Sequence, residues 1–137
     1  MGYGNSEIFL TAEQRENLIH SLMGKVVSVV IDRPIGHTHV TKGITLHYTV
    51  NYGYIPGVMG GDGEEQDVYV LGVTEPLQHF TGRIIGAVRR RDDNEDKLIA
   101  APDGVILEKH QMEAAIHFVE RYFDSCVQSV FSSEETK

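Results

Sequence analysis

The fold of this chain is indicated mainly by one loop-forming segment, Asn51-Tyr-Gly-Tyr-Ile-Pro-Gly-Val-Met-Gly-Gly-Asp-Gly-Glu-Glu-Gln-Asp67. This segment leads into the apolar run Val68-Tyr-Val-Leu-Gly-Val73. Its glycines and proline favour a loop, and three acids follow as Asp62, Glu64 and Asp67. Closely spaced carboxylates on such backbone can form a cage of hard oxygen ligands for a divalent cation. An ordinary acidic turn is the alternative interpretation.

The composition indicates one soluble globular domain, residues 1–137, with a substantial core. The chain has 137 residues, of which 41% are hydrophobic and 23% charged. Its formal net charge of −8 argues against nucleic acid as a partner, since binding DNA or RNA normally requires a concentrated basic face. An acidic chain that handles phosphate can obtain positive charge from a bound metal ion.

The sequence also favours the cytoplasm over a membrane or an oxidising compartment. The only cysteine, Cys126, lies near the end of a helical pattern and has no partner for an internal disulfide. No apolar run is long enough to span a bilayer, and residues 1–9 lack the features of a signal peptide. We therefore expect a cytoplasmic protein without membrane contact.

The order of the expected elements is typical of the α+β class, with the strands forming a small barrel-like sheet. A capping-box pattern at Thr11 and Gln14 precedes the first helix. The acids at 92–96 lie between two strands, as at the tip of a hairpin. The periodicity predicts helices at 12–23 and 110–123, strands at 25–32, 48–54, 68–73, 82–91 and 97–101, and a long polar loop at 33–47.

Two ordered motifs resemble soluble family I inorganic pyrophosphatases. The first is Tyr48-Thr-Val-Asn-Tyr-Gly-Tyr-Ile-Pro-Gly57 followed by Asp62-Gly-Glu-Glu-Gln-Asp67, and the second is Asp92-Asp-Asn-Glu-Asp-Lys-Leu-Ile-Ala-Ala-Pro102. The resemblance extends from about Val26 to Tyr122. It implies an OB-like five-stranded β-barrel with an N-terminal and a C-terminal helix, and hydrolysis of pyrophosphate to two phosphates with Mg²⁺ or Mn²⁺. Members of that family form oligomers, so a homo-oligomer is one expectation.

The resemblance also implies roles for individual residues. Asp62 and Asp67 would bind metal, Glu64 would support the attacking water as a base, and Lys97 would face the substrate. In the acidic tip, Asp92 or Asp93 would be the first ligand and Glu95 or Asp96 the second, while Asp32 ends the first strand where the family has a glutamate. The expected substrate contacts come from Tyr48, Tyr52, Tyr122, Arg33 and Lys42, with Tyr52 also orienting a metal carboxylate.

The sequence departs from the family on the substrate side. The segment 36–42 is contracted, and Phe123 stands where the family has a lysine, so Arg33, His37, His39 or Lys42 would have to replace the missing cations. His37 and His39 could alternatively bind a transition metal or simply lie on the surface. Two further functions therefore stay open: hydrolysis of another phosphoanhydride or phosphate ester, and a non-catalytic metal-binding or nucleotide-binding module.

Overall fold

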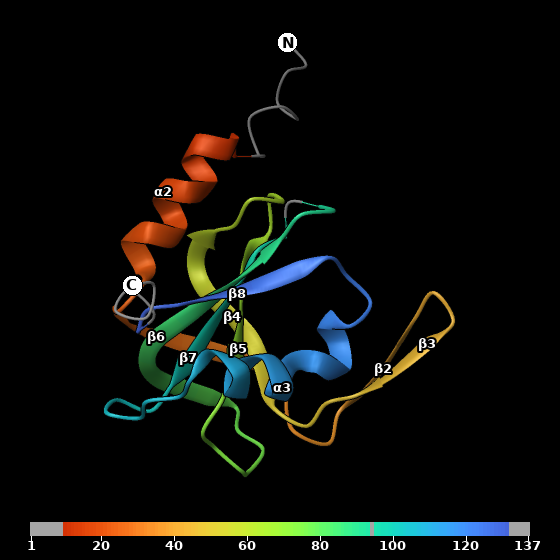
Figure 1. The fold of residues 1–137 in the computed structure, drawn as a ribbon. Coiled ribbons are helices and arrows are strands. Elements are labelled where there is room, and N and C mark those ends of the chain that lie inside the picture. Colours follow the sequence, from red (N-terminus) through yellow and green to blue (C-terminus); the bar gives the residue numbers. More distant parts are fainter. Residues whose placement is uncertain (1–9, 94, 132–137) are drawn as a thin grey trace.

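The computed structural model describes residues 10–93 and 95–131, so the expectation for the N-terminal residues 1–9 lies outside the described part. Within these ranges, two helices and eight strands follow one another (Figure 1). In order they are α2 (Ala12–Leu22), β1 (Val26–Arg33), β2 (Thr38–Thr41), β3 (Ile44–His47), β4 (Asn51–Met59), β5 (Glu65–Val70), β6 (His79–Arg90), β7 (Lys97–Ala101), α3 (Lys109–Glu120) and β8 (Ser125–Ser129).

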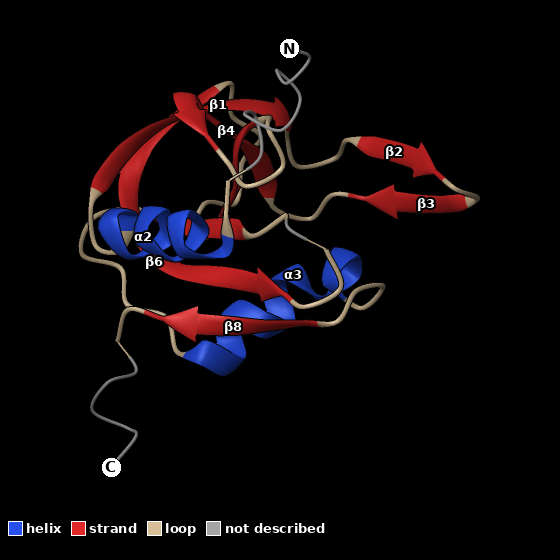
Figure 2. Ribbon diagram, turned by 90° about the horizontal axis from the view of Figure 1, so that it is seen from above, coloured by secondary structure: helices blue, strands red, loops and turns tan. Residues whose placement is uncertain are grey.

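Five strands form a closed barrel, as predicted from the sequence. They are hydrogen-bonded in the order β1-β4-β5-β7-β6, and β6 pairs back onto β1 to close the sheet. The β5–β7 pair is parallel, whereas the other barrel pairs are antiparallel. Strand β8 adds to the outer side of β6, and α2 and α3 lie beside the barrel (Figures 1 and 2). The closed sheet with its two helices is the OB-like arrangement.

The apolar side chains form two clusters on opposite faces of the barrel strands. In β5, Val68 and Val70 belong to a cluster drawn from all five barrel strands, whereas Tyr69 between them packs in a second cluster. That second cluster includes Met112 and Ile116 of α3. The alternation follows from the two-residue period of a strand. It explains why the run after the acidic loop is almost continuously apolar, since both of its faces are buried.

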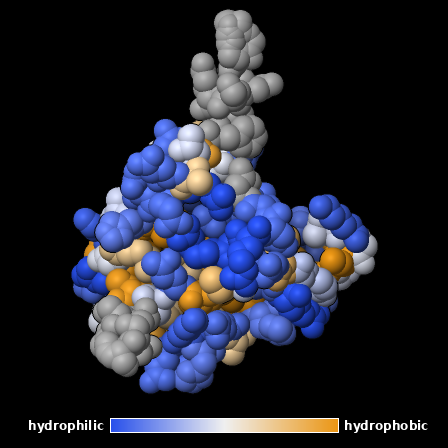
Figure 3. Space-filling model, turned by 45° about the horizontal axis from the view of Figure 1, so that its top comes forward, coloured by the Kyte–Doolittle hydropathy of each residue, from blue (hydrophilic) through white to orange (hydrophobic). Residues whose placement is uncertain are grey.

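The prediction of a loop at 33–47 was wrong, because β2 and β3 form a separate two-stranded hairpin. Thr41 pairs with Ile44 across a two-residue turn in which Lys42 and Gly43 have φ angles of 50° and 78°. Positive φ at both central residues is the requirement of a type I′ turn, which matches the twist of the strands. The hairpin projects as an arm that carries both hydrophobic and hydrophilic surface (Figures 2 and 3).

The C-terminal part also differs from the prediction. Helix α3 ends at Glu120, three residues before the expected Phe123, and the chain then returns along β6 as β8. Cys126 consequently lies in a strand rather than a helix and is a half-buried free thiol. The first helix matches its prediction to within one residue, and Thr11 forms the expected capping box with Gln14. Neither helix in the described ranges has the length and apolar character needed to cross a membrane.

Candidate active site

A pocket of about 440 Å³ brings together residues from the hairpin, the barrel strands, the acidic tip and the end of α3. Ten of the fourteen predicted site residues line it, and Asp32, Asp92, Asp93 and Asp96 do not. The ten are Arg33, Lys42, Tyr48, Tyr52, Asp62, Glu64, Asp67, Glu95, Lys97 and Tyr122. The two sequence motifs therefore meet at one site in space.

Asp67 and Lys97 form the polar centre of the pocket. Lys97 Nζ lies 2.7 Å from Asp67 Oδ2 and 3.5 Å from Glu95 Oε1. The Tyr52 hydroxyl is hydrogen-bonded to Asp67, and burial, followed by the nearby Asp67 charge, raises its pKa well above the usual range. Tyr52 therefore stays protonated and donates to the carboxylate. Asp67 is thus held from two sides in a fixed orientation.

The acidic loop folds so that Asp62 and Glu64 reach the same pocket. Its ends are joined by a hydrogen bond of 2.7 Å from the Gly60 N–H to the Glu64 carbonyl. Asp62 Oδ1 accepts the Glu64 N–H at 3.1 Å, and Gly63 adopts a φ of 85° that a side chain would disfavour. This compact turn brings both acids close to the start of β5, where Asp67 follows.

Arg33 is a cation that lies against two aromatic residues of the pocket, Tyr48 and Tyr52. Arg33 donates from Nη1 to the Tyr48 hydroxyl at 2.7 Å, and its guanidinium lies over the rings of Tyr48 and Tyr52, with distances of 5.6 and 5.4 Å to the ring centroids. Lys42 reaches the pocket from the hairpin turn. Within the described ranges, neither Arg33 nor Lys42 has a carboxylate oxygen within 4 Å.

Arg90 is a site residue that the sequence interpretation missed. Its side chain is 3% exposed, and it donates to Glu120 Oε1 and Oε2 at 3.1 and 2.8 Å. The Tyr69 hydroxyl donates to the same Glu120 at 2.6 Å, and the Phe123 ring centroid lies 3.6 Å from the Arg90 guanidinium carbon. The run of three arginines at 89–91 was a sequence signal for a cation, but it did not identify which one turns inward.

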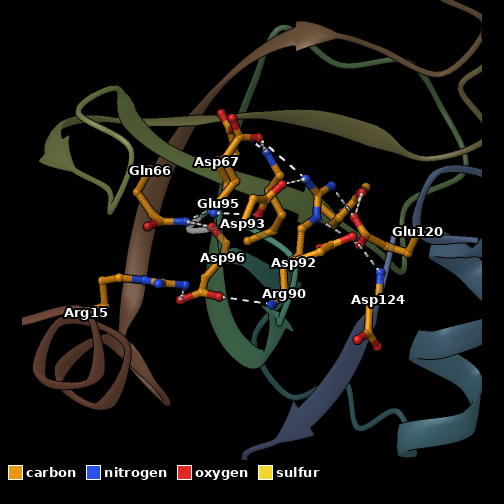
Figure 4. A network of polar contacts seen from close by, with 12 residues as sticks. Arg15, Gln66, Asp67, Arg90, Asp92, Asp93, Glu95, Asp96, Glu120 and Asp124 are labelled. Carbon is orange, nitrogen blue, oxygen red and sulfur yellow. Dashed lines mark hydrogen bonds and ion pairs between the residues drawn. The ribbon is translucent and has the colours of Figure 1, made fainter. Parts of the chain in front are cut away.

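The acidic tip divides its carboxylates between two sides of the molecule (Figure 4). Glu95 lines the pocket, whereas Asp96 turns toward α2, pairs with Arg15 at 2.9 Å and accepts the Arg90 backbone N–H at 3.1 Å. Asp92 accepts the Asp124 backbone N–H at 3.0 Å. The sequence left open whether Glu95 or Asp96 is the second ligand of the tip. In the structure, Glu95 lines the pocket with the other acids, whereas Asp96 is paired with Arg15.

The remaining candidates lie at the edge of the site. Asp32 is outside the pocket lining, and its pKa is raised chiefly by burial, with a contribution from the Asp67 charge that Arg33 opposes. The rings of His37 and His39 stack at 6.5 Å between centroids, and only His39 of the two lines the pocket. Residues 10–93 and 95–131 contain no group of three or more His, Cys, Asp or Glu side chains placed to bind a metal ion.

Comparison with known proteins agrees with this geometry. Residues 23–130 match the model of the inorganic pyrophosphatase family. An inorganic pyrophosphatase of Xylella fastidiosa is 29% identical over 119 residues, which cover 72% of this chain and 65% of the relative. One from Helicobacter pylori is 30% identical over 94 residues, covering 57% and 54%. The chain thus spans about two thirds or less of the length of these curated relatives.

Solved structures show the same fold. An inorganic pyrophosphatase from Ehrlichia chaffeensis aligns with a TM-score of 0.60 at 20% identity, covering 82% of this chain and 91% of that one. A second from Neisseria gonorrhoeae gives a TM-score of 0.56 at 17% identity, covering 82% and 87%. Together with the family match over residues 23–130, this places the protein in the inorganic pyrophosphatase family.

Proposed function

We propose that this protein hydrolyses the phosphoanhydride bond of inorganic pyrophosphate with the help of bound divalent cations. The observation that supports this most directly is the meeting of Asp62, Glu64, Asp67 and Glu95 with Lys97 in one pocket. Carboxylates that bind a cation and a lysine that faces a phosphate are the groups that phosphoryl transfer requires. Membership of the pyrophosphatase family supports the same reaction.

The donor chemistry of the pocket fits a hard cation such as Mg²⁺ or Mn²⁺. All four pocket acids offer oxygen ligands, which these ions prefer. We assign metal binding to Asp62, Asp67 and Glu95, which line one pocket but must move closer together to share an ion, with Lys97 and Tyr52 orienting Asp67. What a divalent cation supplies when bound is a lower pKa for a coordinated water and neutralisation of charge on the phosphates.

The protein's own side chains would position the reactants. We assign to Glu64, which lines the same pocket as Asp67, the acceptance of a proton from the attacking water. Arg33 and Lys42 have no carboxylate partner within 4 Å in the described ranges, so their charges are available to a phosphate. Tyr122, at 43% exposure, can donate its hydroxyl at the mouth of the pocket.

Replacement of Asp67 tests this function. Asp67→Asn keeps the size of the side chain and one oxygen but removes the negative charge. We expect the release of phosphate from pyrophosphate to fall at least about 100-fold, with an unchanged far-ultraviolet circular dichroism spectrum. Asp92→Asn is the matched control, because Asp92 lies outside the pocket lining and should leave the rate nearly unchanged. Full activity in Asp67→Asn would contradict the assignment.

A further inference from the structure

Arg90 is a pocket residue that the proposed function does not use. Its side chain is 3% exposed, yet it lines the cavity together with Asp67, Glu95 and Lys97. The N–H donors of a guanidinium form a planar fork, and when the group is covered from solvent these donors normally meet acceptors at hydrogen-bond distance. The two edges of the Arg90 fork differ in this respect.

The edge of Arg90 that faces α3 is fully engaged. Its Nε and Nη2 atoms donate to the two carboxylate oxygens of Glu120 at 3.1 and 2.8 Å, and the Tyr69 hydroxyl donates to the same carboxylate at 2.6 Å. The centroid of the Phe123 ring lies 3.6 Å from the guanidinium carbon. A bidentate pair covered by a ring fixes the plane of the guanidinium, and therefore the direction in which Nη1 points.

The edge of Arg90 that faces the acidic tip has no close acceptor among the described residues. Its Nη1 atom lies 3.4 Å from Asp93 Oδ2 and 3.5 Å from Glu95 Oε1, whereas charge-assisted N–H···O bonds are typically about 2.7–2.9 Å long (Figure 4). The Asp93 and Glu95 side chains are 32% and 41% exposed, so water competes for them. A buried donor without an acceptor at normal distance marks a place where a ligand can bind.

Lys97 approaches the same oxygen of Glu95. Its Nζ atom is also 3.5 Å from Glu95 Oε1, and its closer partner is Asp67 at 2.7 Å. Cations from β6 and the start of β7 thus converge on one oxygen position, and neither makes a short contact there. Two cations near one point favour a negatively charged oxygen at that point. Because the proposed function assigns Glu95 to a metal ion with Asp62 and Asp67, the position that Glu95 Oε1 leaves is open to an oxygen of the substrate.

We propose that Arg90 is a further substrate-binding residue, and that its Nη1 and Lys97 Nζ together bind a phosphate oxygen at the position that Glu95 Oε1 occupies in the structure. This inference rests on the proposed function and keeps its substrate. Arg90 can bind phosphate without releasing Glu120, because the two anions lie on different edges of the fork. Divalent cations supply most of the charge neutralisation on a diphosphate, so Arg90 adds a directed hydrogen bond.

Binding of methylenediphosphonate, a non-hydrolysable analogue of pyrophosphate, tests the role of Arg90. Calorimetry is performed with Mg²⁺ at a concentration that saturates each variant. We expect Arg90→Lys to bind the analogue about tenfold more weakly than the wild type, because an ammonium keeps the charge but lacks the second edge of the fork. Arg89→Lys is the matched control, since Arg89 pairs with Glu16 outside the pocket lining, and its affinity should be unchanged.

A role of Arg90 through Glu95 alone is separated by a double-mutant cycle. If Arg90 contacts the phosphate, the same loss of about tenfold should appear when Arg90→Lys is introduced into Glu95→Gln. A loss that disappears in the Glu95→Gln background would show that Arg90 only positions that acid, and would overturn the inference.

Another pair of variants removes the cation without leaving a buried carboxylate unpaired. Arg90→Met/Glu120→Gln should bind the analogue about tenfold more weakly than Glu120→Gln, which keeps Arg90. Circular dichroism shows that each variant is folded. Equal affinities of these two variants would contradict a phosphate contact by Arg90, whatever the result with Arg90→Lys.

The outcomes also distinguish this inference from the proposed function. Wild-type affinity in Arg90→Lys, or no binding of the analogue by the wild type, would overturn the inference even in an enzyme that hydrolyses pyrophosphate. Phosphate release from pyrophosphate by the wild type is measured in parallel. If no phosphate is released with Mg²⁺ or Mn²⁺, the proposed function fails, and the affinities then decide separately whether Arg90 binds phosphate.

Discussion

Arg90 is the residue at which the pocket, the acidic tip and α3 meet. Its guanidinium is paired with Glu120 of α3, faces Asp93 and Glu95 of the tip at 3.4 and 3.5 Å, and is covered by Phe123. A charge buried to this extent is tolerated only because several acceptors surround it. The position of Glu95 in the pocket therefore depends on Arg90, which is itself held by Glu120, 30 residues further along the chain.

Removing the negative charge of Glu120 should destabilise the fold strongly. In Glu120→Gln, the buried Arg90 keeps its charge but loses its closest carboxylate, and breaking such a pair costs about 3 kcal/mol of unfolding free energy or more. Urea denaturation measures the difference. Asp124→Asn is the control, because the Arg91–Asp124 pair is 57% and 60% exposed and should contribute nothing measurable. Similar losses in the two variants would show that Arg90 is better solvated than the structure indicates.

Tyr69 should make the fold sensitive to alkaline pH. Burial and the Glu120 charge raise the pKa of the Tyr69 hydroxyl well above its usual value of 10. Above about pH 10, the unfolded chain loses this proton while the folded chain keeps it, so stability falls as pH rises toward the pKa of the folded state. Urea unfolding between pH 9 and about pH 11 should show a smaller decline for Tyr69→Phe than for the wild type. Equal slopes would contradict this assignment.

The pairing of β1 with β4 most constrains the loop-forming segment 51–67 at Gly53, which lies in β4. A Cβ atom added to Gly53 would lie 1.8 Å from the Val30 carbonyl oxygen of the neighbouring strand, which cannot move without opening the barrel. We therefore expect Gly53→Ala to cost at least about 3 kcal/mol of unfolding free energy. Gly104→Ala is the matched control, since it meets only the strain of a φ of 91° in open space and should cost about 1–2 kcal/mol. The reverse order would contradict the close approach of β1 and β4.

Most barrel strands could be predicted because their apolar runs are long, whereas the two missed strand regions lack that signal. The hairpin turn at Lys42 and Gly43 does not carry the Asn-Gly or Asp-Gly pair that announces a type I′ turn. Strand β8 buries Ser129 beside Val127, so it shows no apolar alternation. The linear motifs located Asp67 and Lys97, but the Arg90–Glu120 pair joins residues 30 positions apart and becomes visible only in the folded chain.

At the scale of the whole molecule, closure of the barrel brings the pocket residues together from five regions of the chain. Asp62, Asp67 and Glu95 line one pocket only when β5, β7 and β6 are in register. A cation bound by these acids therefore binds the folded chain and not the unfolded one. Such a ligand stabilises the fold by an amount that grows with its concentration relative to its dissociation constant.

Divalent metal should consequently raise the free energy of unfolding of the intact protein. At a Mg²⁺ concentration 100 times its dissociation constant, we expect a gain of about 2.7 kcal/mol, measured by urea denaturation against sodium at equal ionic strength. The sodium control removes general screening of the net charge of −8. The double variant Asp62→Asn/Asp67→Asn should lose the gain, whereas Asp92→Asn should keep it. A gain that disappears in Asp92→Asn and persists in the double variant would move the metal site from the pocket to the outer side of the tip, because Asp92 is outside the pocket lining.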